Sequence, residues 1–258
     1  MRIVIKIGTS TLAHSSGHLN IRRVEELCKV ISDIKNAGNQ VIVVSSGAIG
    51  VGMGKLGLPE KPTSTKEKQA LAAIGQCELM FMYDKLFGEY NNMVAQVLLT
   101  RGDVDTEHGK ENVLNTFNTL LSMGIIPIVN ENDTVAIDEL EGHNFGDNDM
   151  LSAIVAKLVS ADGLVILTNI DGLYDADPRK NKDAKRLERV EKITEEIEQM
   201  AGGSGSNRGT GGMTTKVMAA KYVTEAGIDC FVIAGDDPER IYDVTDGKSV
   251  GTLFCANK

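Results

Sequence analysis

The sequence lacks both a hydrophobic run that could cross a membrane and a signal-peptide pattern at its start. No apolar stretch reaches the roughly 18 to 20 residues that a bilayer requires, and strand-like residues begin at Arg2, which leaves no room for a leader. Its four cysteines are scattered and form no Cys-x-x-Cys pair, so we expect reduced thiols in a reducing compartment. Together these absences predict a soluble, cytoplasmic protein without a membrane partner.

Basic residues are also in the minority. The 258-residue chain has 27 Lys and Arg against 36 Asp and Glu, a formal net charge of −9, and its basic residues form no cluster. Because general nucleic-acid binding depends on neutralising phosphates, this balance argues against a nucleic-acid partner. The length allows a large core in one or two domains.

Several catalytic signatures are missing. The protein-kinase motifs His-Arg-Asp and Asp-Phe-Gly do not occur, no Gly-x-Ser-x-Gly elbow follows a strand, and the histidines show no metal spacing. Residues 247–249 resemble the end of a Walker A loop, but Tyr242 stands where its first glycine is required. Residues 52–57 match the dinucleotide fingerprint by letter. They do not directly follow a strand, however, and Pro59 argues against a long helix there, so we reject that match.

The sequence does contain an almost continuous alternation of apolar, β-rich runs with amphipathic helical patterns. The predicted strands are residues 3–7, 41–44, 94–99, 125–129, 164–167 and 230–233, and the predicted helices about 20–37, 66–88, 109–122, 148–159 and 213–226. Several strands are apolar throughout, as in parallel sheets covered by helices on both faces. We therefore predict an α/β fold with right-handed crossovers. A charge-rich stretch, residues 175–198, is predicted to be a solvated excursion, and two lobes could meet near residue 170.

A glycine-rich stretch, residues 202–216, runs directly into a helical pattern. Lys216 falls in the first turn of that helix, where a cation is disfavoured unless an anion is near. Glycines, helix start and lysine together indicate a phosphate site. The alternative is a flexible linker before an ordinary helix, which fits residues 202–209 well and residues 210–216 poorly.

Ligands of open α/β sheets bind where loops leave the carboxyl ends of strands, and the first two such loops here are rich in small polar residues. Lys6 interrupts an apolar strand, and Gly8 lets the chain turn directly after it; alternation on an edge strand is nearly as good an interpretation. Ser45, Ser46 and Gly47 end the next strand. They suit a carboxylate or phosphate close to the backbone, although a serine-capped turn would explain one serine.

Later loops are polar as well. Residues 130–133, Asn-Glu-Asn-Asp, could bind a substrate amino group or form an ordinary turn. Residues 145–149, Phe-Gly-Asp-Asn-Asp, precede the apolar helical run 150–159. One Asp is enough to cap that helix, so capping leaves Asn148 and Asp149 partly unexplained. Residues 168–179 could hold a nucleoside or be a simple polar loop.

In their order along the chain, these segments resemble the amino-acid kinase family, most closely its members that phosphorylate glutamate. The matching segments are 6–10, 43–48, 68–76, 96–103, 126–135, 145–149, 171–174 and 209–216. The resemblance implies one kinase domain, residues 1–258, folded as an αβα sandwich around an open, mainly parallel central sheet. It divides this domain into an amino-acid-binding lobe of about 1–165 and a nucleotide-binding lobe of about 166–258.

The resemblance also implies the reaction and its residues. ATP would phosphorylate the γ-carboxylate of L-glutamate to L-glutamyl 5-phosphate, the first step of proline biosynthesis. Lys6 and Lys216 would be the catalytic lysines, held in place by a catalytic Asp149. The residues that bind glutamate would be Ser46, Asp133 and Asn148. The residues that bind ATP would be Lys6, Gly8, Thr168, Asn169, Thr210, Gly211, Gly212, Met213, Thr214, Thr215 and Lys216. Asn169 stands where the family usually has Asp.

This chemistry agrees with the residues present. A carboxylate is already an anionic nucleophile, so its attack on a phosphoryl group needs no general base. The obstacle is repulsion between anions, which lysines, backbone N–H groups and Mg²⁺ relieve. Mg²⁺ would ride mainly on the nucleotide phosphates, so no metal-binding residues are expected.

Other expectations follow from the same resemblance. We expect a homodimer or tetramer, feedback inhibition by proline, a mobile cover at residues 202–209 and a flap at residues 50–68. Many relatives have a C-terminal RNA-modification-enzyme-like (PUA) domain, which this chain is expected to lack. The alternatives are a kinase for another small acid, such as a carbamate, N-acetylglutamate or aspartate, and a non-catalytic sensor. The paired motifs at residues 45–48 and 130–133 disfavour the first, and retention of both Lys6 and Lys216 disfavours the second.

Overall fold

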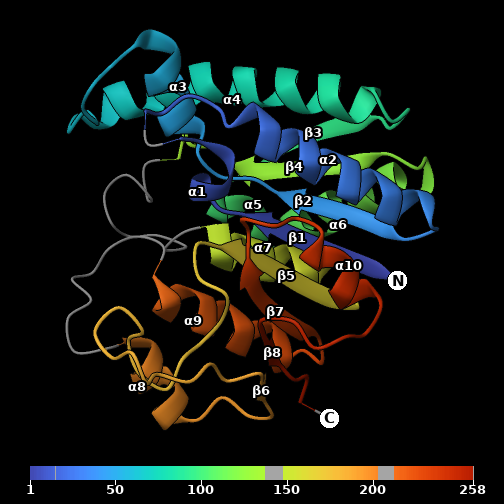
Figure 1. Ribbon diagram of the computed structural model, residues 1–258. Coiled ribbons are helices and arrows are strands. Elements are labelled where there is room, and N and C mark those ends of the chain that lie inside the picture. Colours follow the sequence, from blue (N-terminus) through green and yellow to red (C-terminus); the bar gives the residue numbers. More distant parts are fainter. Residues whose placement is uncertain (15, 137–147, 203–211, 258) are drawn as a thin grey trace.

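A single eight-stranded sheet forms the centre of the computed structural model, which describes residues 1–14, 16–136, 148–202 and 212–257 (Figure 1). Its strand order is β3-β4-β2-β1-β5-β7-β8-β6, and all pairings are parallel except β7 with β8. The strands are β1 (Arg2–Ile7), β2 (Gln40–Val44), β3 (Val94–Leu99), β4 (Ile126–Glu131), β5 (Gly163–Thr168), β6 (Arg189–Val190), β7 (Asp229–Ala234) and β8 (Thr252–Phe254). The predicted α/β fold with an open, mainly parallel sheet is confirmed.

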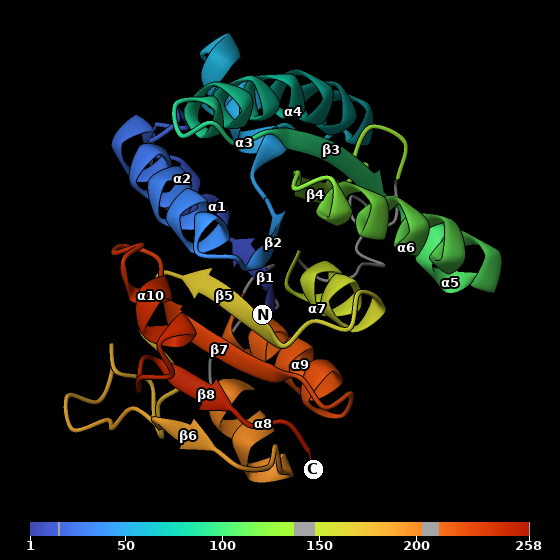
Figure 2. The same cartoon turned by 90° about the vertical axis from the view of Figure 1, so that its right-hand side faces the viewer.

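Helices cover both faces of this sheet, which makes the fold an αβα sandwich (Figure 2). The core on one face packs against α5 (Arg101–Asp105), α6 (Glu107–Ser122), α7 (Asn148–Leu158), α8 (Glu195–Gly202) and α9 (Met213–Thr224). The core on the other face packs against α1 (Thr9–Leu12), α2 (Ile21–Asn36), α3 (Ala48–Leu56), α4 (Thr65–Gly88) and α10 (Arg240–Thr245).

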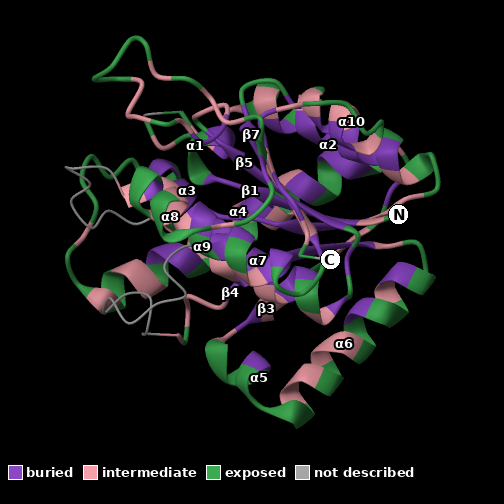
Figure 3. Ribbon diagram, turned by 90° about the horizontal axis from the view of Figure 1, so that it is seen from below, coloured by how far each residue is buried: buried purple, intermediate pink, exposed green. Residues whose placement is uncertain are grey.

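The apolar strands owe their composition to this double cover. In β1, Val4 belongs to the core on the α7 and α9 face, while Ile3, Ile5 and Ile7 belong to the opposite core. Since side chains alternate along a strand, Lys6 lies on the same face as Val4, toward α7 and α9. Buried residues fill the central strands β1, β2, β4 and β5 and the inner surfaces of the helices (Figure 3).

The six predicted strands and five predicted helices are all present, with ends shifted by at most two residues. One of the two-residue shifts lengthens β4 to Glu131, so Asn130 belongs to the strand and not to the following turn. β1 lies in the middle of the sheet, between β2 and β5, so the edge-strand interpretation of Lys6 is wrong. The division into two functional lobes stays a prediction.

Two predicted irregular segments contain regular structure. Residues 175–198 were expected to be a solvated excursion, but they supply β6, which pairs with β8, and the start of α8. The predicted flap at residues 50–68 is helical at both ends, in α3 and in the first turn of α4. In both cases the short elements gain their order from tertiary packing, which outweighs weak local sequence signals.

Glycines let α3 and α4 pack backbone against backbone. A Cβ atom on Gly75 would lie 1.7 Å from the carbonyl oxygen of Ala48, and one on Gly52 would lie 2.1 Å from that of Leu71. Gly52 and Gly54, the first two glycines of the rejected dinucleotide fingerprint, therefore lie inside a helix and serve close packing. Within the described part of the chain, no helix is both long and apolar enough to span a membrane.

Candidate functional site

Three charged side chains from distant parts of the sequence meet in the interior. Lys6 Nζ lies 2.7 Å from Asp149 Oδ1, and Lys216 Nζ lies 3.0 Å from Asp149 Oδ2. Lys6 comes from β1, Asp149 from the first turn of α7 and Lys216 from the first turn of α9. All three are buried, with exposed fractions of 2%, 0% and 3%. The structure thus brings together the three residues that the sequence analysis selected as catalytic.

The opposite charges within this cluster stabilise one another. Burial alone would raise the pKa of Asp149, but the nearby ammonium groups of Lys6 and Lys216 outweigh it and hold that pKa below its ordinary value. Thr215 supports the same state, since its hydroxyl donates a 2.8 Å hydrogen bond to Asp149 Oδ2. One carboxylate therefore orients two ammonium groups, each able to offer further donors to an anion.

The start of α9 adds to this anion-favouring character. Gly212 is the N-terminal cap of α9, and Met213, Thr214 and Thr215 form its first turn, where N–H groups have no partner within the helix. The hydroxyl of Thr214 donates to the carbonyl oxygen of Ala201, which ties this turn to α8. Two of the predicted ATP contacts, Thr210 and Gly211, lie outside the described residues, as do residues 145–147 and most of the predicted cover, residues 203–209.

A second cluster lies at the carboxyl ends of β2 and β4. The two N–H groups of Asn148 Nδ2, at the start of α7, are shared among three acceptors: Ser46 Oγ at 3.0 Å, Asn130 Oδ1 at 2.8 Å and the backbone carbonyl oxygen of Ser45. Asp133 follows β4 by two residues, on the same edge of the sheet. Because Asn148 and Asp149 are adjacent in the chain, this cluster adjoins the lysine cluster directly.

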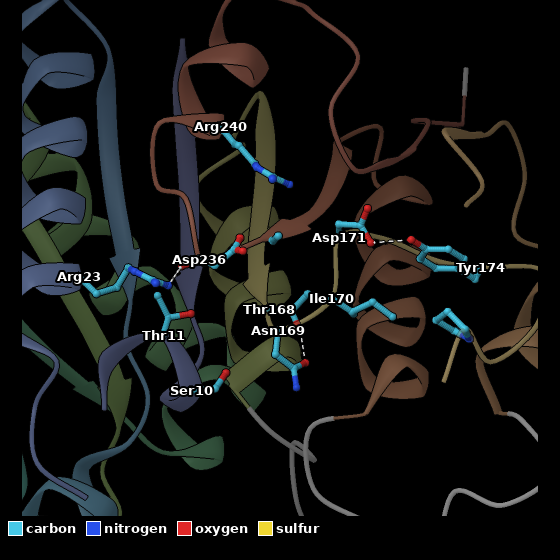
Figure 4. Close-up of a pocket in the computed structure, with 13 residues that line it drawn as sticks. Ser10, Thr11, Arg23, Thr168, Asn169, Ile170, Asp171, Tyr174, Asp236 and Arg240 are labelled. Atoms are coloured by element: carbon cyan, nitrogen blue, oxygen red, sulfur yellow. Dashed lines mark hydrogen bonds between the residues drawn. The ribbon is translucent and has the colours of Figure 1, made fainter. Parts of the chain in front are cut away.

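A cavity of about 500 Å³ opens beyond the carboxyl ends of β5 and β7 (Figure 4). Thr168 and Asn169, both predicted to bind ATP, line it, and the hydroxyl of Thr168 donates to Asn169 Oδ1. Gly8 lies between this region and the lysines, since a Cβ atom there would be 3.3 Å from the carbonyl oxygen of Leu167 and 3.8 Å from Lys6 Nζ. The predicted nucleotide residues thus extend from the cavity to the lysine cluster.

The sequence analysis did not select the other cavity residues individually. Tyr174 and Asp171 lie on one wall, joined by a 2.9 Å hydrogen bond, and Asp171 also pairs with Arg186 at 2.8 Å (Figure 4). Arg23 lies on the opposite wall and donates to the carbonyl oxygen of Gly235. Tyr174 and Asp171 belong to a segment that the sequence analysis had matched. Arg23 carries no local signal, because it reaches the cavity only through the packing of α2 near α10 and the residues that follow β7.

Comparison with known proteins places these features in a family. A model of the amino acid kinase family matches residues 1–234. The chain belongs to the amino acid kinase family. Over all 258 residues it is 59% identical to a glutamate 5-kinase from Clostridium perfringens, of which it covers 96%, and 54% identical to one from Listeria innocua, of which it covers 94%. At this identity over its full length, the chain falls among the glutamate 5-kinases of the family.

Solved structures of the amino acid kinase fold agree with this architecture. An isopentenyl phosphate kinase from T. acidophilum superimposes with a TM-score of 0.67 at 20% identity, covering 98% of this chain and 100% of that one. A carbamate kinase from Giardia lamblia bound to AMP-PNP has the same TM-score at 18% identity and covers 99% of this chain and 98% of its own. At such identities the likeness supports the fold alone.

Proposed function

We propose that the chain transfers the γ-phosphoryl group of ATP to the γ-carboxylate of L-glutamate, forming L-glutamyl 5-phosphate in the first step of proline biosynthesis. The observation that carries this proposal is the buried cluster of Lys6, Asp149 and Lys216 beside the carboxamide and hydroxyl of Asn148 and Ser46. The close, full-length similarity to glutamate 5-kinases selects glutamate from among small carboxylates.

The two lysines supply the main catalytic effect. Phosphoryl transfer between a carboxylate and ATP brings two anions together and spreads negative charge over the transferring oxygens. Two ammonium groups, fixed by one carboxylate within 3.0 Å, meet that charge without reorganising during the reaction. Since the nucleophile is already ionised, neither lysine needs to accept a proton.

The N-terminal region supplies the glutamate site. Ser46 Oγ accepts the hydrogen bond from Asn148, so its own O–H group is a donor suited to a substrate carboxylate. Asp133, on the same edge of the sheet, is the anionic partner for the substrate ammonium group. We assign residues up to about 165 to this amino-acid-binding lobe.

The C-terminal region supplies the nucleotide site, with the nucleoside in the cavity lined by Thr168 and Asn169 and the phosphates at Gly8 and the start of α9. Mg²⁺ accompanies the nucleotide phosphates and neutralises part of their charge. Asp149 has both oxygens within 3.0 Å of lysine ammonium groups, which suits it to orienting cations of the protein and not to holding the metal. Action in the cytoplasm, assembly as a dimer or tetramer, and inhibition by proline belong to the same proposal.

A trapping assay tests the reaction. The purified chain with Mg-ATP, L-glutamate and hydroxylamine is expected to form glutamyl hydroxamate, because hydroxylamine captures the acyl phosphate. Lys216→Ala is expected to reduce this signal to background, since it removes one of the two phosphate-handling charges. Aspartate and N-acetylglutamate are each assayed in place of glutamate as alternative substrates. Hydroxamate from either of them but not from glutamate, or none above the Lys216→Ala level, would contradict the proposal.

Lys6→Ala is expected to lower kcat by roughly 10²- to 10³-fold, the range found on removing one transition-state donor, and to change the glutamate KM by less than about threefold. The reason is that Lys6 stabilises charge that develops only during transfer. Steady-state kinetics at saturating ATP measure both constants. Lys29→Ala, which removes an exposed lysine from α2, is the matched control and should match the wild type. An effect of Lys6→Ala confined to glutamate KM would argue against a phosphoryl role.

A further inference from the structure

A row of hydrogen-bonded amides runs from the edge of the sheet to the proposed glutamate site. Gln96, exposed on the edge strand β3, accepts a 3.1 Å hydrogen bond from Gln76 Nε2 on α4. Gln76 Oε1 accepts a 2.9 Å bond from Asn130 Nδ2 on β4, and Asn130 Oδ1 accepts the 2.8 Å bond from Asn148. Gln76, Asn130 and Asn148 are all buried. The row joins four elements, β3, α4, β4 and α7.

Backbone groups determine which way every amide in this row points. The backbone N–H of Glu131 donates to Asn130 Oδ1 at 2.9 Å, and an N–H group can only be a donor. Asn130 must therefore turn its Nδ2 atom toward Gln76, which in turn must present Oε1. At the other end, the carbonyl oxygen of Ser45 can only accept, so it holds the Nδ2 atom of Asn148 on its own side. A flipped amide anywhere in the row would oppose donor to donor or acceptor to acceptor.

We infer that Gln76 is a positioning residue for the glutamate site, acting through Asn130 on Asn148 and Ser46. The side chain of Gln76 forms hydrogen bonds with the amides of Gln96 and Asn130, and neither partner belongs to the lysine cluster. Its side-chain oxygen is the acceptor that satisfies the buried Nδ2 group of Asn130. Without that acceptor, the buried Nδ2 group of Asn130 has no partner, which is costly. The backbone N–H of Glu131 still holds the oxygen of Asn130, so we expect the side chain to tilt and not to flip. A tilt would displace the oxygen that orients Asn148.

The inference rests on the proposed function, because it concerns the site for glutamate. Gln76→Met keeps the length of the side chain and removes its amide. We expect the glutamate KM to rise about tenfold, with kcat and the ATP KM within about twofold of the wild type, since the lysine cluster is not touched. Gln96→Met removes only the outer, exposed member of the row, and we expect an increase in glutamate KM of about two- to threefold.

The experiment measures glutamate and ATP kinetics for both variants beside Leu79→Ala. Leu79 lies one turn further along α4 and is buried, but it belongs to the apolar core and not to the amide row. Leu79→Ala loosens the same helix, so it reports what general destabilisation does to KM. The thermal unfolding midpoint of each variant measures how far that variant is destabilised. Its glutamate KM is expected to stay within about twofold of the wild type.

The outcomes separate this inference from the function on which it rests. A wild-type chain without glutamate kinase activity defeats the proposed function itself. An active wild type with an unchanged glutamate KM in Gln76→Met overturns only the positioning role. Equal increases in the KM values of glutamate and ATP, or an increase as large in Leu79→Ala, would show that α4 acts through general stability and would also overturn it. Should Gln76→Met fail to fold, an unchanged glutamate KM in Gln96→Met rejects the inference.

Discussion

Replacing Asp149 with asparagine is expected to lower kcat by about 10³-fold, the upper end of the range for losing one group that stabilises a transition state. Asparagine has nearly the same shape, but it offers one acceptor oxygen and one donor nitrogen where the native side chain offers two acceptors. One of the two lysines, 2.7 Å and 3.0 Å away in the native site, would then face an N–H group. The ammonium pair would lose its counter-charge and its fixed geometry together.

The same substitution should also reduce stability. Breaking a buried ion pair by removing one partner costs about 3–5 kcal/mol, because a buried charge is left uncompensated. Here two buried lysines would share that loss. Urea unfolding at pH 7 measures the difference, and Asp84→Asn, an exposed position on α4, is the matched control that should leave both kcat and the unfolding midpoint unchanged.

The pH dependence identifies the carboxylate as the cause. The pKa of Asp149 is lower in the folded state than its ordinary value of 3.8. Its contribution to stability is therefore complete above that value and is lost as the pH falls through the folded-state pKa. The difference in unfolding free energy between wild type and Asp149→Asn should stay constant from pH 7 to about pH 5 and shrink below about pH 4. A difference that does not vary with pH would assign the effect to shape and not to charge.

The resemblance to the amino-acid kinase family predicted this cluster, and each of its members also carries a local signal. Lys6 breaks an apolar strand, Asp149 is one polar residue too many for a helix cap, and Lys216 is a cation at a helix start. Each signal has an ordinary alternative, and only their order along the chain made the set specific. The spacing of residues did not show where β1 lies in the sheet or which face Lys6 occupies. The structure shows that β1 is a central strand and that Lys6 faces α7 and α9.

Other site residues carried no comparable signal. Gln76 lies in a segment that was recognised by resemblance, yet nothing in its neighbours along α4 indicates that it meets Asn130, 54 positions away. Arg23 and Arg240 reach the cavity from two helices on the same face of the sheet. Such residues acquire a role only through the crossing of helices over the sheet, which depends on the whole chain and not on a local pattern. The short strands β6 and β8 were missed for the same reason.

Gly75→Ala is expected to be among the most damaging substitutions away from the charged cluster. An added Cβ atom would lie 1.7 Å from the carbonyl oxygen of Ala48 and 2.6 Å from the backbone nitrogen of Gly52, where real Cβ contacts are almost never below 3.0 Å. The backbone of α3 would have to retreat by about 1.3 Å, the difference between 1.7 Å and 3.0 Å. Overpacking of this kind costs about 1–3 kcal/mol and occasionally more, and the obstacle here is backbone that no rotamer change can relieve.

The displacement would also reach the active site. Ala48 is the first residue of α3, and only Gly47, in a left-handed conformation with φ of 90°, separates it from Ser46, so a shift of α3 is expected to reach Ser46. A misplacement of about 1 Å can cost roughly 10²-fold in rate, and we expect a loss of that order in kcat/KM for glutamate.

Gly88→Ala provides the matched control, because Gly88 ends the same helix and a Cβ atom there would meet nothing within 4 Å. Alanine is the better helix former by about 1 kcal/mol, so this variant should unfold at a temperature equal to or above that of the wild type and keep full activity. If alanine damages the protein at position 75 and not at position 88, the need for glycine at position 75 comes from its contact with α3. If Gly75→Ala proved as stable and active as Gly88→Ala, α3 and α4 could not pack backbone against backbone as described, and the position of Ser46 would have to depend on other contacts.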